Sequence, residues 1–248
     1  MKGQKLEKDL GFEFDEYSCF VKIRDIGAYN GQTLVIPREY EGNEVVRIEP
    51  YAFQNCKTIT KMEMEDNIES IGEASFNRCA NLQMVILSEK LRLIPKYAFS
   101  GCVALSSITL GKNIKQIDDW AFAECTNLLS ITLPNGILRI GERAFYACKN
   151  LKTINFPNSL KIIEKDAFYG CLELTEVVID ENVGMIGDWA FADCKKLETI
   201  RFLGTAKQWS AVQKGKNWNC EIKATEVQCA DTTVKLKKTI AKGNTFML

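Results

Sequence analysis

The sequence predicts a repeat solenoid, in which short coils of chain stack side by side around one shared core. A phenylalanine and a cysteine three residues later return together at a fixed interval of 23 residues. An isoleucine five residues before each phenylalanine returns at the same interval. Self-similarity at such a period is the signature of stacked structural repeats. One copy has too little apolar surface to fold alone, so we expect neighbouring copies to bury it against each other.

The three repeated positions should form three files of identical side chains along the stack. Burial of each large apolar side chain contributes about 1.5–3 kcal/mol, and this contribution recurs in every coil. Free cysteine is among the most buried residue types, so we expect core thiols and not metal ligands or disulfides. The members of the files are Phe53, Phe76, Phe99, Phe122, Phe145, Phe168 and Phe191; Cys56, Cys79, Cys102, Cys125, Cys148, Cys171 and Cys194; and Ile48, Ile71, Ile94, Ile117, Ile140, Ile163 and Ile186.

Each coil should contain two strands and a short helical turn. Apolar residues alternate with polar ones after each cysteine, as in NLLSITLP at 127–134, which predicts a strand. A second, shorter apolar stretch precedes the Ala-Phe pair. The spacing in Ala-Phe-x-x-Cys is typical of a helical or 3₁₀ turn that is too short for a full α-helix. Stacking these coils should give a parallel sheet with the helical turns along another edge.

The chain divides into a repeat region with a cap at each end. Charged residues 1–11 are expected to be a flexible N-terminus, and 12–44 an N-terminal hairpin cap with a first irregular repeat and a longer loop at REYEGNE. The regular solenoid spans 45–203, a C-terminal cap 204–231, and a linker or disordered tail 232–248. Such caps cover the open ends that a solenoid would otherwise expose.

The C-terminal cap is expected to contain a helix and a strand. Thr205 is a suitable N-cap for a helix that runs through Val212 and lays Trp209 over the last coil. The strand at 226–229 should pair with the open edge of the sheet, which prevents end-to-end association. The alternative is that Trp209 and Trp218 stack on a sugar.

Composition argues against several classes of function. The 248 residues include 32 Lys+Arg and 32 Asp+Glu, so the formal net charge is zero and no overall field favours nucleic acid or an anionic membrane. No apolar stretch is long enough to span a bilayer. We therefore expect neither a nucleic-acid partner nor membrane insertion. The segment MKGQKLEKDLGFEF at the start has no apolar core of signal-peptide length.

The sequence contains no recognisable catalytic or metal-binding motif. It has no histidine, so Ser-His and Cys-His pairs are excluded. Gly111 and Lys112 lack the flanking residues of a phosphate-binding loop, and no Asp-x-Asp-x-Asp run suggests calcium. Asp118 and Asp119 are expected to be solvated in a turn. We predict no catalytic residue, no cofactor, no metal site and no enzymatic activity.

Two surfaces are candidates for binding a partner. The first is the outward face of the predicted sheet, where a partner could lie across several coils at once; the alternative is that these are simply soluble strand residues. The second is an aromatic column directly before Ala-Phe, since Trp, Tyr and Arg dominate binding hot spots, although these side chains could also just cover their own turns. The sheet-face residues are Ser107, Thr109, Ser130, Thr132, Thr153, Asn155, Glu176 and Val178, and the aromatic column is Tyr51, Tyr97, Trp120, Arg143 and Trp189.

The consensus AFxxC-xxL-xxI-x-L(P) resembles the BspA-like leucine-rich repeats, also called the Treponema pallidum type, from Leu34 to Phe202. The stretch from Gly204 to Asp231 is similar to the segment that closes many members of that family. The resemblance implies a non-catalytic, secreted or cell-surface protein of a host-associated microbe that adheres to a host extracellular-matrix or cell-surface protein.

Two other functions stay open. An intracellular scaffold or regulatory module in the cytoplasm is favoured by the unpaired cysteines and by the lack of a signal peptide in the sequence given. Carbohydrate binding would be favoured by a glycan-sized groove between exposed aromatic side chains. The sequence names neither the ligand nor the oligomeric state.

Overall fold

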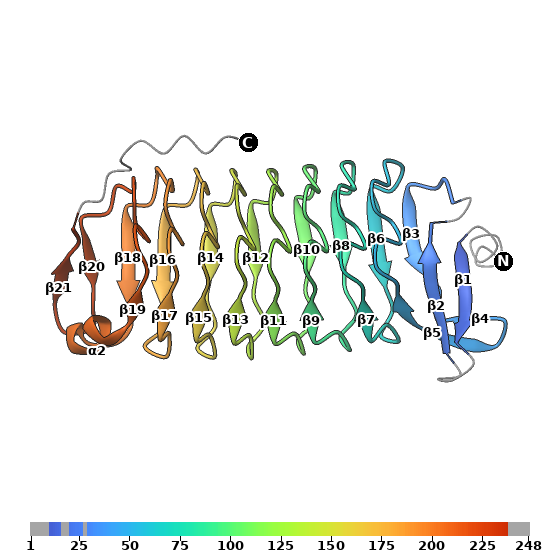
Figure 1. Cartoon of the computed structure of the whole chain (residues 1–248), viewed down its shortest axis with the longest axis horizontal. Coiled ribbons are helices and arrows are strands. Elements are labelled where there is room, and N and C mark those ends of the chain that lie inside the picture. The colour runs from blue at the N-terminus through green and yellow to red at the C-terminus, as the bar shows by residue number, and fades with distance from the viewer. Residues whose placement is uncertain (1–9, 16–19, 27–28, 238–248) are drawn as a thin grey trace.

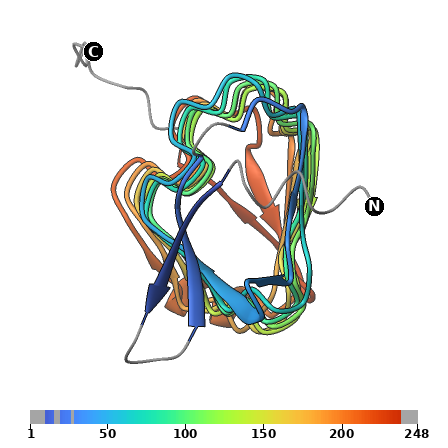
Figure 2. The same ribbon diagram turned by 90° about the vertical axis from the view of Figure 1, so that its right-hand side faces the viewer.

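The chain forms one long row of stacked coils, as predicted. A computed structural model describes residues 10–15, 20–26 and 29–237. In Figure 1 the coils follow one another from the N-terminal to the C-terminal end of the row. Viewed along the row, successive coils overlie one another in Figure 2. The interior of each coil is filled by the apolar residues of the repeat, which form a single continuous core.

Within a sheet, the first strands of neighbouring coils pair in parallel. In the regular coils the partners are 23 residues apart, as Ser130 pairs with Thr153. The strands form a four-stranded sheet, β10-β8-β6-β3, and a six-stranded sheet that begins at β12, where one continuous sheet was expected. The stacked rings of Phe99 and Phe122 lie 5.5 Å apart at this break, the widest spacing in their file. The strands are β3 Thr33–Ile36, β6 Lys61–Met64, β8 Met84–Ile86, β10 Ser107–Thr109, β12 Ser130–Thr132, β14 Thr153–Asn155, β16 Glu176–Ile179 and β18 Thr199–Phe202.

The second strand of each coil from β7 to β19 is only two residues long, and from β7 to β17 it ends in the buried isoleucine of the repeat. Six of these strands form a parallel sheet in the order β19-β17-β15-β13-β11-β9, and β7 pairs with β5. They are β7 Ser70–Ile71, β9 Leu93–Ile94, β11 Gln116–Ile117, β13 Arg139–Ile140, β15 Ile162–Ile163, β17 Met185–Ile186 and β19 Gln213–Lys214.

The Ala-Phe-x-x-Cys segment is a turn and not a helix, which corrects the expectation of short helical turns. Alternate amides bond in two directions: Cys125 N–H donates to the Phe122 carbonyl at 3.2 Å, whereas Phe122 N–H donates to Ala144 in the next coil at 2.8 Å. Trp120 N–H also donates to the next coil, at Glu142. Trp120 has a φ of 60°, and such left-handed residues interrupt a helix. The i→i−3 bonds explain the 3₁₀-like spacing.

The phenylalanine and cysteine files are both buried and continuous. Neighbouring phenylalanine rings stack with centroids 5.1–5.5 Å apart. From Cys79 to Cys194 each thiol donates to the carbonyl of the phenylalanine one coil earlier, at 3.0–3.3 Å. Burial raises the pKa of the Cys148 thiol to about 12. The repeat therefore uses cysteine as a small side chain that fills the core and supplies a donor.

The N-terminal cap is a hairpin, β1 Gly11–Asp15 and β2 Phe20–Asp25, and β2 runs parallel to β5 Asn43–Ile48. The REYEGNE segment is not a plain loop, because β4 Glu39–Tyr40 pairs antiparallel with β5. Gly42, with a φ of 79°, permits the tight turn between them. Within the stretch expected to be flexible, Leu10 is buried in the core, and 1–9 lie outside the described residues.

The C-terminal cap contains the expected helix, α2 Ala206–Ala211, with Thr205 as N-cap in a capping box with Gln208. Trp209 is buried, with its ring 5.2 Å from Phe202 and 5.8 Å from Trp218. Both tryptophans thus cover the last coil, which removes them as an exposed sugar platform. β20 Glu226–Gln228 pairs parallel with β18, as expected of the strand at the sheet edge.

Two features of this cap were not expected. β21 Thr233–Lys235 pairs antiparallel with β20, so the described part of the predicted tail begins with a strand; 238–248 lie outside the described residues. The cap also contains a degenerate coil. Phe191 N–H donates to the Trp218 carbonyl at 2.8 Å, and Asn217 has the left-handed φ of the repeat, 54°. Insertion of α2 hides this coil from a search at the regular period.

Candidate functional site

The described residues contain no group of three or more histidine, cysteine, aspartate or glutamate side chains arranged to hold a metal ion. No helix among them has the length and apolar character needed to cross a membrane. The cysteines of the repeat are buried, and burial raises the pKa of Cys125 and Cys171 well above the ordinary thiol value.

An aromatic ridge runs along the Ala-Phe edge of the coils. It consists of Tyr97, Trp120, Arg143, Tyr146 and Tyr169, all of which are partly exposed. Ring centroids are 5.8 Å apart between Tyr97 and Trp120, 5.8 Å between Trp120 and Tyr146, and 5.4 Å between Tyr146 and Tyr169. The Arg143 guanidinium lies 4.7 Å from the Trp120 ring centroid and 5.9 Å from that of Tyr146. These contacts link four successive coils into one amphipathic strip.

Arg143 is held in place by a neighbouring carboxylate. Its Nε and Nη2 atoms each lie 3.0 Å from Oδ2 of Asp166, one coil further along. Asp166 is 6% exposed. Burial raises the pKa of its carboxyl above the ordinary value, although the charges of Arg143 and Lys165 act to lower it. The guanidinium is thus fixed over Trp120 before any partner binds, which reduces the entropy lost on binding.

Three ridge residues occupy a slot with a left-handed backbone, which is one of two such slots in the repeat. Tyr97, Trp120 and Arg143 have φ values of 57°, 60° and 55°. A left-handed conformation costs a residue other than glycine of order 1–3 kcal/mol. All seven regular coils nevertheless have a side chain here: Tyr51, Ala74, Tyr97, Trp120, Arg143, Asp166 and Trp189. The side chains at this slot are therefore kept against a backbone cost.

The structure brings together only part of the expected aromatic column. Tyr51 is 53% exposed and is separated from Tyr97 by the coil that has Ala74 in this slot. Trp189 is partly exposed and lies beyond Asp166, so it does not join the ridge. Sequence reasoning missed Tyr146 and Tyr169, although their 23-residue separation directly after Ala-Phe was a usable signal.

A hollow of about 420 Å³ opens at the N-terminal end of the ridge. Ala74, which is almost fully buried, lies between the tyrosines that flank it. Polar side chains form most of the remaining wall. The lining residues are Tyr51, Gln54, Glu73, Ala74, Asn77, Arg78, Tyr97, Ser100, Gly101, Trp120 and Glu124.

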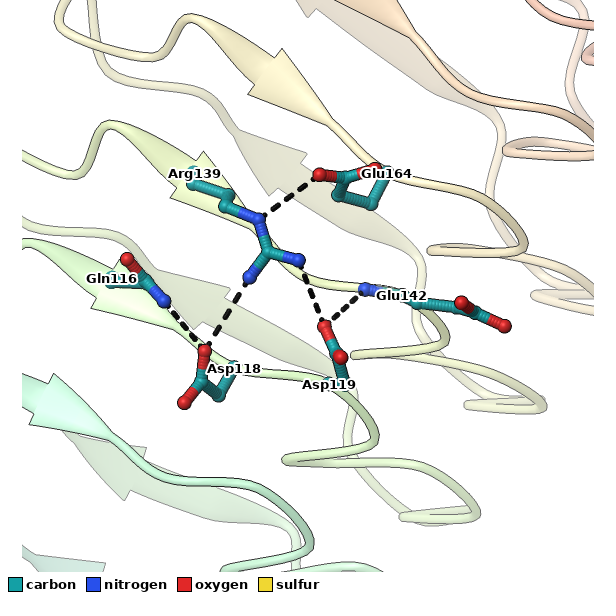
Figure 3. Close-up of polar contacts among 6 residues, drawn as sticks. All are labelled: Gln116, Asp118, Asp119, Arg139, Glu142 and Glu164. Carbon is teal, nitrogen blue, oxygen red and sulfur yellow. Dashed lines mark hydrogen bonds and ion pairs between the residues drawn. The ribbon is translucent and has the colours of Figure 1, made fainter.

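Asp118 and Asp119 are engaged by Arg139 and are not simply solvated, which corrects the expectation (Figure 3). Arg139 Nη1 lies 3.4 Å from Asp118 Oδ1, Nη2 3.0 Å from Asp119 Oδ1, and Nε 3.0 Å from Glu164 Oε1. Burial alone would lower the pKa of Arg139, but its hydrogen bonds to Glu164 and Asp119 raise it overall. This network joins three coils through one cation, so we regard it as a structural clamp.

The two sheets formed by the first strands of the coils present the predicted row of polar side chains on their outward face. Ser130 and Thr132 are exposed on either side of buried Ile131, and the next coils repeat the pattern. Glu176 and Val178 are only partly exposed. The face is continued by the in-register pairing of β12, β14 and β16. The exposed members are Ser107, Thr109, Ser130, Thr132, Thr153 and Asn155.

Fold and surfaces together define a leucine-rich-repeat solenoid. The family described as BspA type leucine-rich repeat region (6 copies) matches residues 46–172 and 121–238, and the chain belongs to this family. The crystal structure of a T. pallidum leucine-rich repeat protein, TpLRR, is similar at 26% identity and a TM-score of 0.71, over 77% of this chain and 88% of that one.

A second solved structure, a leucine-rich repeat protein from Bacteroides ovatus, is similar in fold. It has 22% identity and a TM-score of 0.67, over 90% of this chain and 76% of that chain. Among curated proteins, none matches this sequence. The family membership agrees with the repeat pattern, and leucine-rich-repeat solenoids suggest a role in protein interaction.

Proposed function

We propose that the chain is a non-catalytic protein-binding solenoid that contacts its partner through the aromatic ridge. The observation that carries this proposal is the alignment of Trp120, Arg143 and Tyr146 across successive coils, with the guanidinium held between rings and by Asp166. Tryptophan, tyrosine and arginine are the residue types enriched at binding hot spots. A rigid, amphipathic strip of this kind suits a protein surface with complementary acidic and apolar groups.

The sheet face provides a second contact surface in the same proposal. Its serine, threonine and asparagine side chains are short, so they lose little entropy when a partner covers them. They also let the partner approach the sheet closely over several coils. Thr132 and Thr153 lie at the centre of this face, Ser107 at its N-terminal side, and Glu176 and Val178 at its C-terminal side.

The partner we propose is an extracellular-matrix or cell-surface protein of a host, and the chain would act as an adhesin, secreted by or displayed on a microbe. Membership of the BspA type family supports this direction. The alternative is an intracellular scaffold. Nine free cysteines among the described residues favour that alternative, since reduced thiols are typical of the cytoplasm.

The binding proposal is tested with purified extracellular-matrix proteins immobilised on a sensor surface. The ridge variant carries Arg143→Ser, Tyr146→Ser and Tyr169→Ser, and the sheet-face variant carries Thr132→Lys and Thr153→Lys. Loss of hot-spot residues should weaken binding by tenfold or more, whereas the exposed Lys207→Ser control should bind like the wild type. Equal affinity of the ridge variant and the wild type would remove the ridge from the proposal.

The compartment is tested separately on intact cells of the source organism. Protease treatment from outside, followed by immunodetection of the chain, should remove it if it is displayed, and the culture medium should contain it if it is secreted. Full protection in the cell interior, with none in the medium, would support the intracellular scaffold instead.

A further inference from the structure

In one coil, the left-handed slot directly before Ala-Phe is occupied by a small residue, which leaves a gap in the aromatic column. Ala74 stands where Tyr51 precedes it and Tyr97 follows it. The two tyrosines are separated by two coil spacings, about 9.6 Å at the usual distance between strands. A ring placed midway would lie about 4.8 Å from each, which is within the usual range for ring contacts. The 420 Å³ hollow occupies this position.

The walls of the hollow contain polar groups that are already oriented. Gln54 Nε2 donates to Asn77 Oδ1 at 3.3 Å, and Asn77 Nδ2 donates to the Ser100 carbonyl at 3.1 Å. This ladder of amides crosses three coils along one side of the hollow. Fixed amides of this kind hold their remaining donors and acceptors at constant positions, which favours a ligand with several hydroxyl groups.

Charged groups of both signs lie at the same wall. Glu73, Arg78 and Glu124 line the hollow, and their side chains form no hydrogen bond or ion pair with any other described residue. The Lys96 ammonium lies 5.2 Å from the Tyr97 ring centroid, close to the rim. Two carboxylates and two cations balance, so the local charge selects neither a strong anion nor a strong cation.

These features together favour a sugar over the other occupants of an aromatic gap. A sugar ring has apolar C–H faces that pack against tyrosine and hydroxyl groups that pair with amides, carboxylates and guanidinium. An aromatic side chain of a protein partner would fill the gap but would leave the charged side chains of Glu73 and Arg78 without partners on desolvation, which is costly. An acidic saccharide would face the carboxylates of Glu73 and Glu124.

We propose that the hollow between Tyr51 and Tyr97 is a saccharide-binding site that takes one or two neutral sugar rings. One ring inserts above Ala74, while the amide ladder of Gln54 and Asn77 and the charged groups of the wall bind its hydroxyls. A volume of about 420 Å³ is within the range of roughly 300–1,000 Å³ for small-molecule sites. The hollow shares Tyr97 and Trp120 with the ridge, but saccharide binding does not require protein binding by Arg143, Tyr146 and Tyr169, and either activity can exist without the other.

The test is calorimetric titration of the full chain with defined saccharides. The neutral probes are lactose, cellobiose, maltose and N,N′-diacetylchitobiose, and the acidic probes are sialyllactose and a heparin disaccharide. We expect at least one neutral probe to bind. Ala74→Tyr should reduce that affinity by tenfold or more, because the new ring fills the gap. Tyrosine occupies the same left-handed slot in the coils on both sides, so the variant is expected to fold.

One control variant and two variants of the wall separate loss of the site from loss of structure. Glu221→Tyr introduces a tyrosine at an exposed left-handed position in the C-terminal cap, several coils from the hollow, and should leave saccharide binding unchanged. Arg78→Ala and Glu124→Gln alter exposed wall residues and should each weaken binding several-fold with an unchanged melting temperature.

Several outcomes would overturn the proposal. They are no binding by any neutral probe, tighter binding of an acidic probe, or wild-type affinity in Ala74→Tyr. A tryptophan-containing peptide that binds wild type but not Ala74→Tyr, in the absence of saccharide binding, would assign the hollow to a protein partner. The ridge variant should keep wild-type saccharide affinity, because the three residues that it replaces do not line the hollow.

Discussion

The thiol of Cys125 donates a hydrogen bond to the carbonyl oxygen of Phe99, one coil earlier, at 3.2 Å. The same carbonyl accepts the amide of Cys102 within its own coil, at 3.2 Å. One acceptor therefore serves two donors, and the thiol makes the bond that connects adjacent coils. Because the arrangement recurs along the file, the two invariant positions of the repeat are coupled through backbone as well as through packing.

The first prediction concerns this thiol. Cys125→Ala removes a buried donor and a little volume, so we expect a loss of about 1–2 kcal/mol in the free energy of unfolding. Cys56→Ala is the matched control, because the Cys56 thiol contacts Thr58 in its own coil at 3.3 Å and not an earlier coil. Cys125→Ala should therefore lower the midpoint of urea unfolding by more than Cys56→Ala does. Equal losses would show that the bond between coils adds nothing to stability.

The second prediction concerns the phenylalanine file. Phe122 is fully buried and stacks on Phe99 and Phe145. Phe122→Ala should lower the free energy of unfolding by about 3–5 kcal/mol, since it leaves a cavity in the middle of the stack. Leu129→Ala, at a side chain that is 47% exposed, should change it by less than about 0.5 kcal/mol. Wild-type thermal stability of Phe122→Ala would contradict the burial scheme.

The repeat period was sufficient to predict the solenoid because each core slot is filled by one residue type with a fixed local environment. Phe122 and Cys125 are recognisable from sequence since packing at these positions depends on the adjacent coils, which have the same residues. The conformation of the turn from Trp120 to Cys125 was harder to predict. Its i→i−3 bonds resemble a 3₁₀ helix, and the left-handed conformation of Trp120 is not encoded by glycine or asparagine.

The candidate surfaces were only partly predictable for a different reason. Surface positions are not fixed by the period, so contacts between them depend on side-chain reach across coils. Arg143 was chosen as part of an aromatic column, but its contact with Tyr146 joins two different slots of the repeat. Its ion pair with Asp166 joins the same slot of adjacent coils. The gap at Ala74 could be read from the alignment, yet its hollow depends on how neighbouring side chains stand around it.

The third prediction concerns the Arg139 clamp. Arg139→Met keeps the aliphatic stem but leaves the carboxylates of Asp118, Asp119 and Glu164 close together without their cation. We expect a loss of about 1–2 kcal/mol, discounted because all four side chains are partly solvated. The loss should shrink in 1 M salt, where charges are screened over about 3 Å. The exposed Lys112→Met variant is the control, and an equal loss there would argue against a network.

The fourth prediction concerns the pH dependence caused by Asp166. Its pKa is raised in the folded chain from the ordinary value of 3.8, chiefly by burial. The folded state therefore binds this proton more tightly than the unfolded state. The resulting contribution to stability is present below the unfolded pKa and is lost as the pH rises through the higher folded pKa.

Asp166→Asn removes this titration, so the stability of the wild type relative to the variant should fall as the pH rises from about 3.5 to 7. Chemical unfolding at a series of pH values measures the difference. Glu65→Gln, at an exposed residue, should show no such trend. A relative stability that instead rises with pH would mean that Arg143 lowers the pKa by more than burial raises it.

The fifth prediction concerns the helix that closes the stack. Lys214 Nζ donates to the carbonyl oxygens of Trp209 and Val212 at 2.6 and 2.7 Å, and lies 4.5 Å from the Trp209 ring centroid. It thus satisfies carbonyls at the C-terminal end of α2, which has no basic residue in its own last turn. Burial lowers the pKa of this ammonium, because the charged form loses solvation there.

Lys214→Met should therefore loosen α2 from the last coil without unfolding the central coils. Amide exchange in Ala206–Ala211 should become faster, while exchange at Phe122 and its neighbours stays unchanged. Because Trp209 covers Phe202, its fluorescence should shift to longer wavelength as water reaches the indole. Lys207→Met, on the exposed side of the same helix, is the matched control. A uniform rise in exchange along the whole stack would show instead that the cap and the solenoid unfold as one cooperative unit.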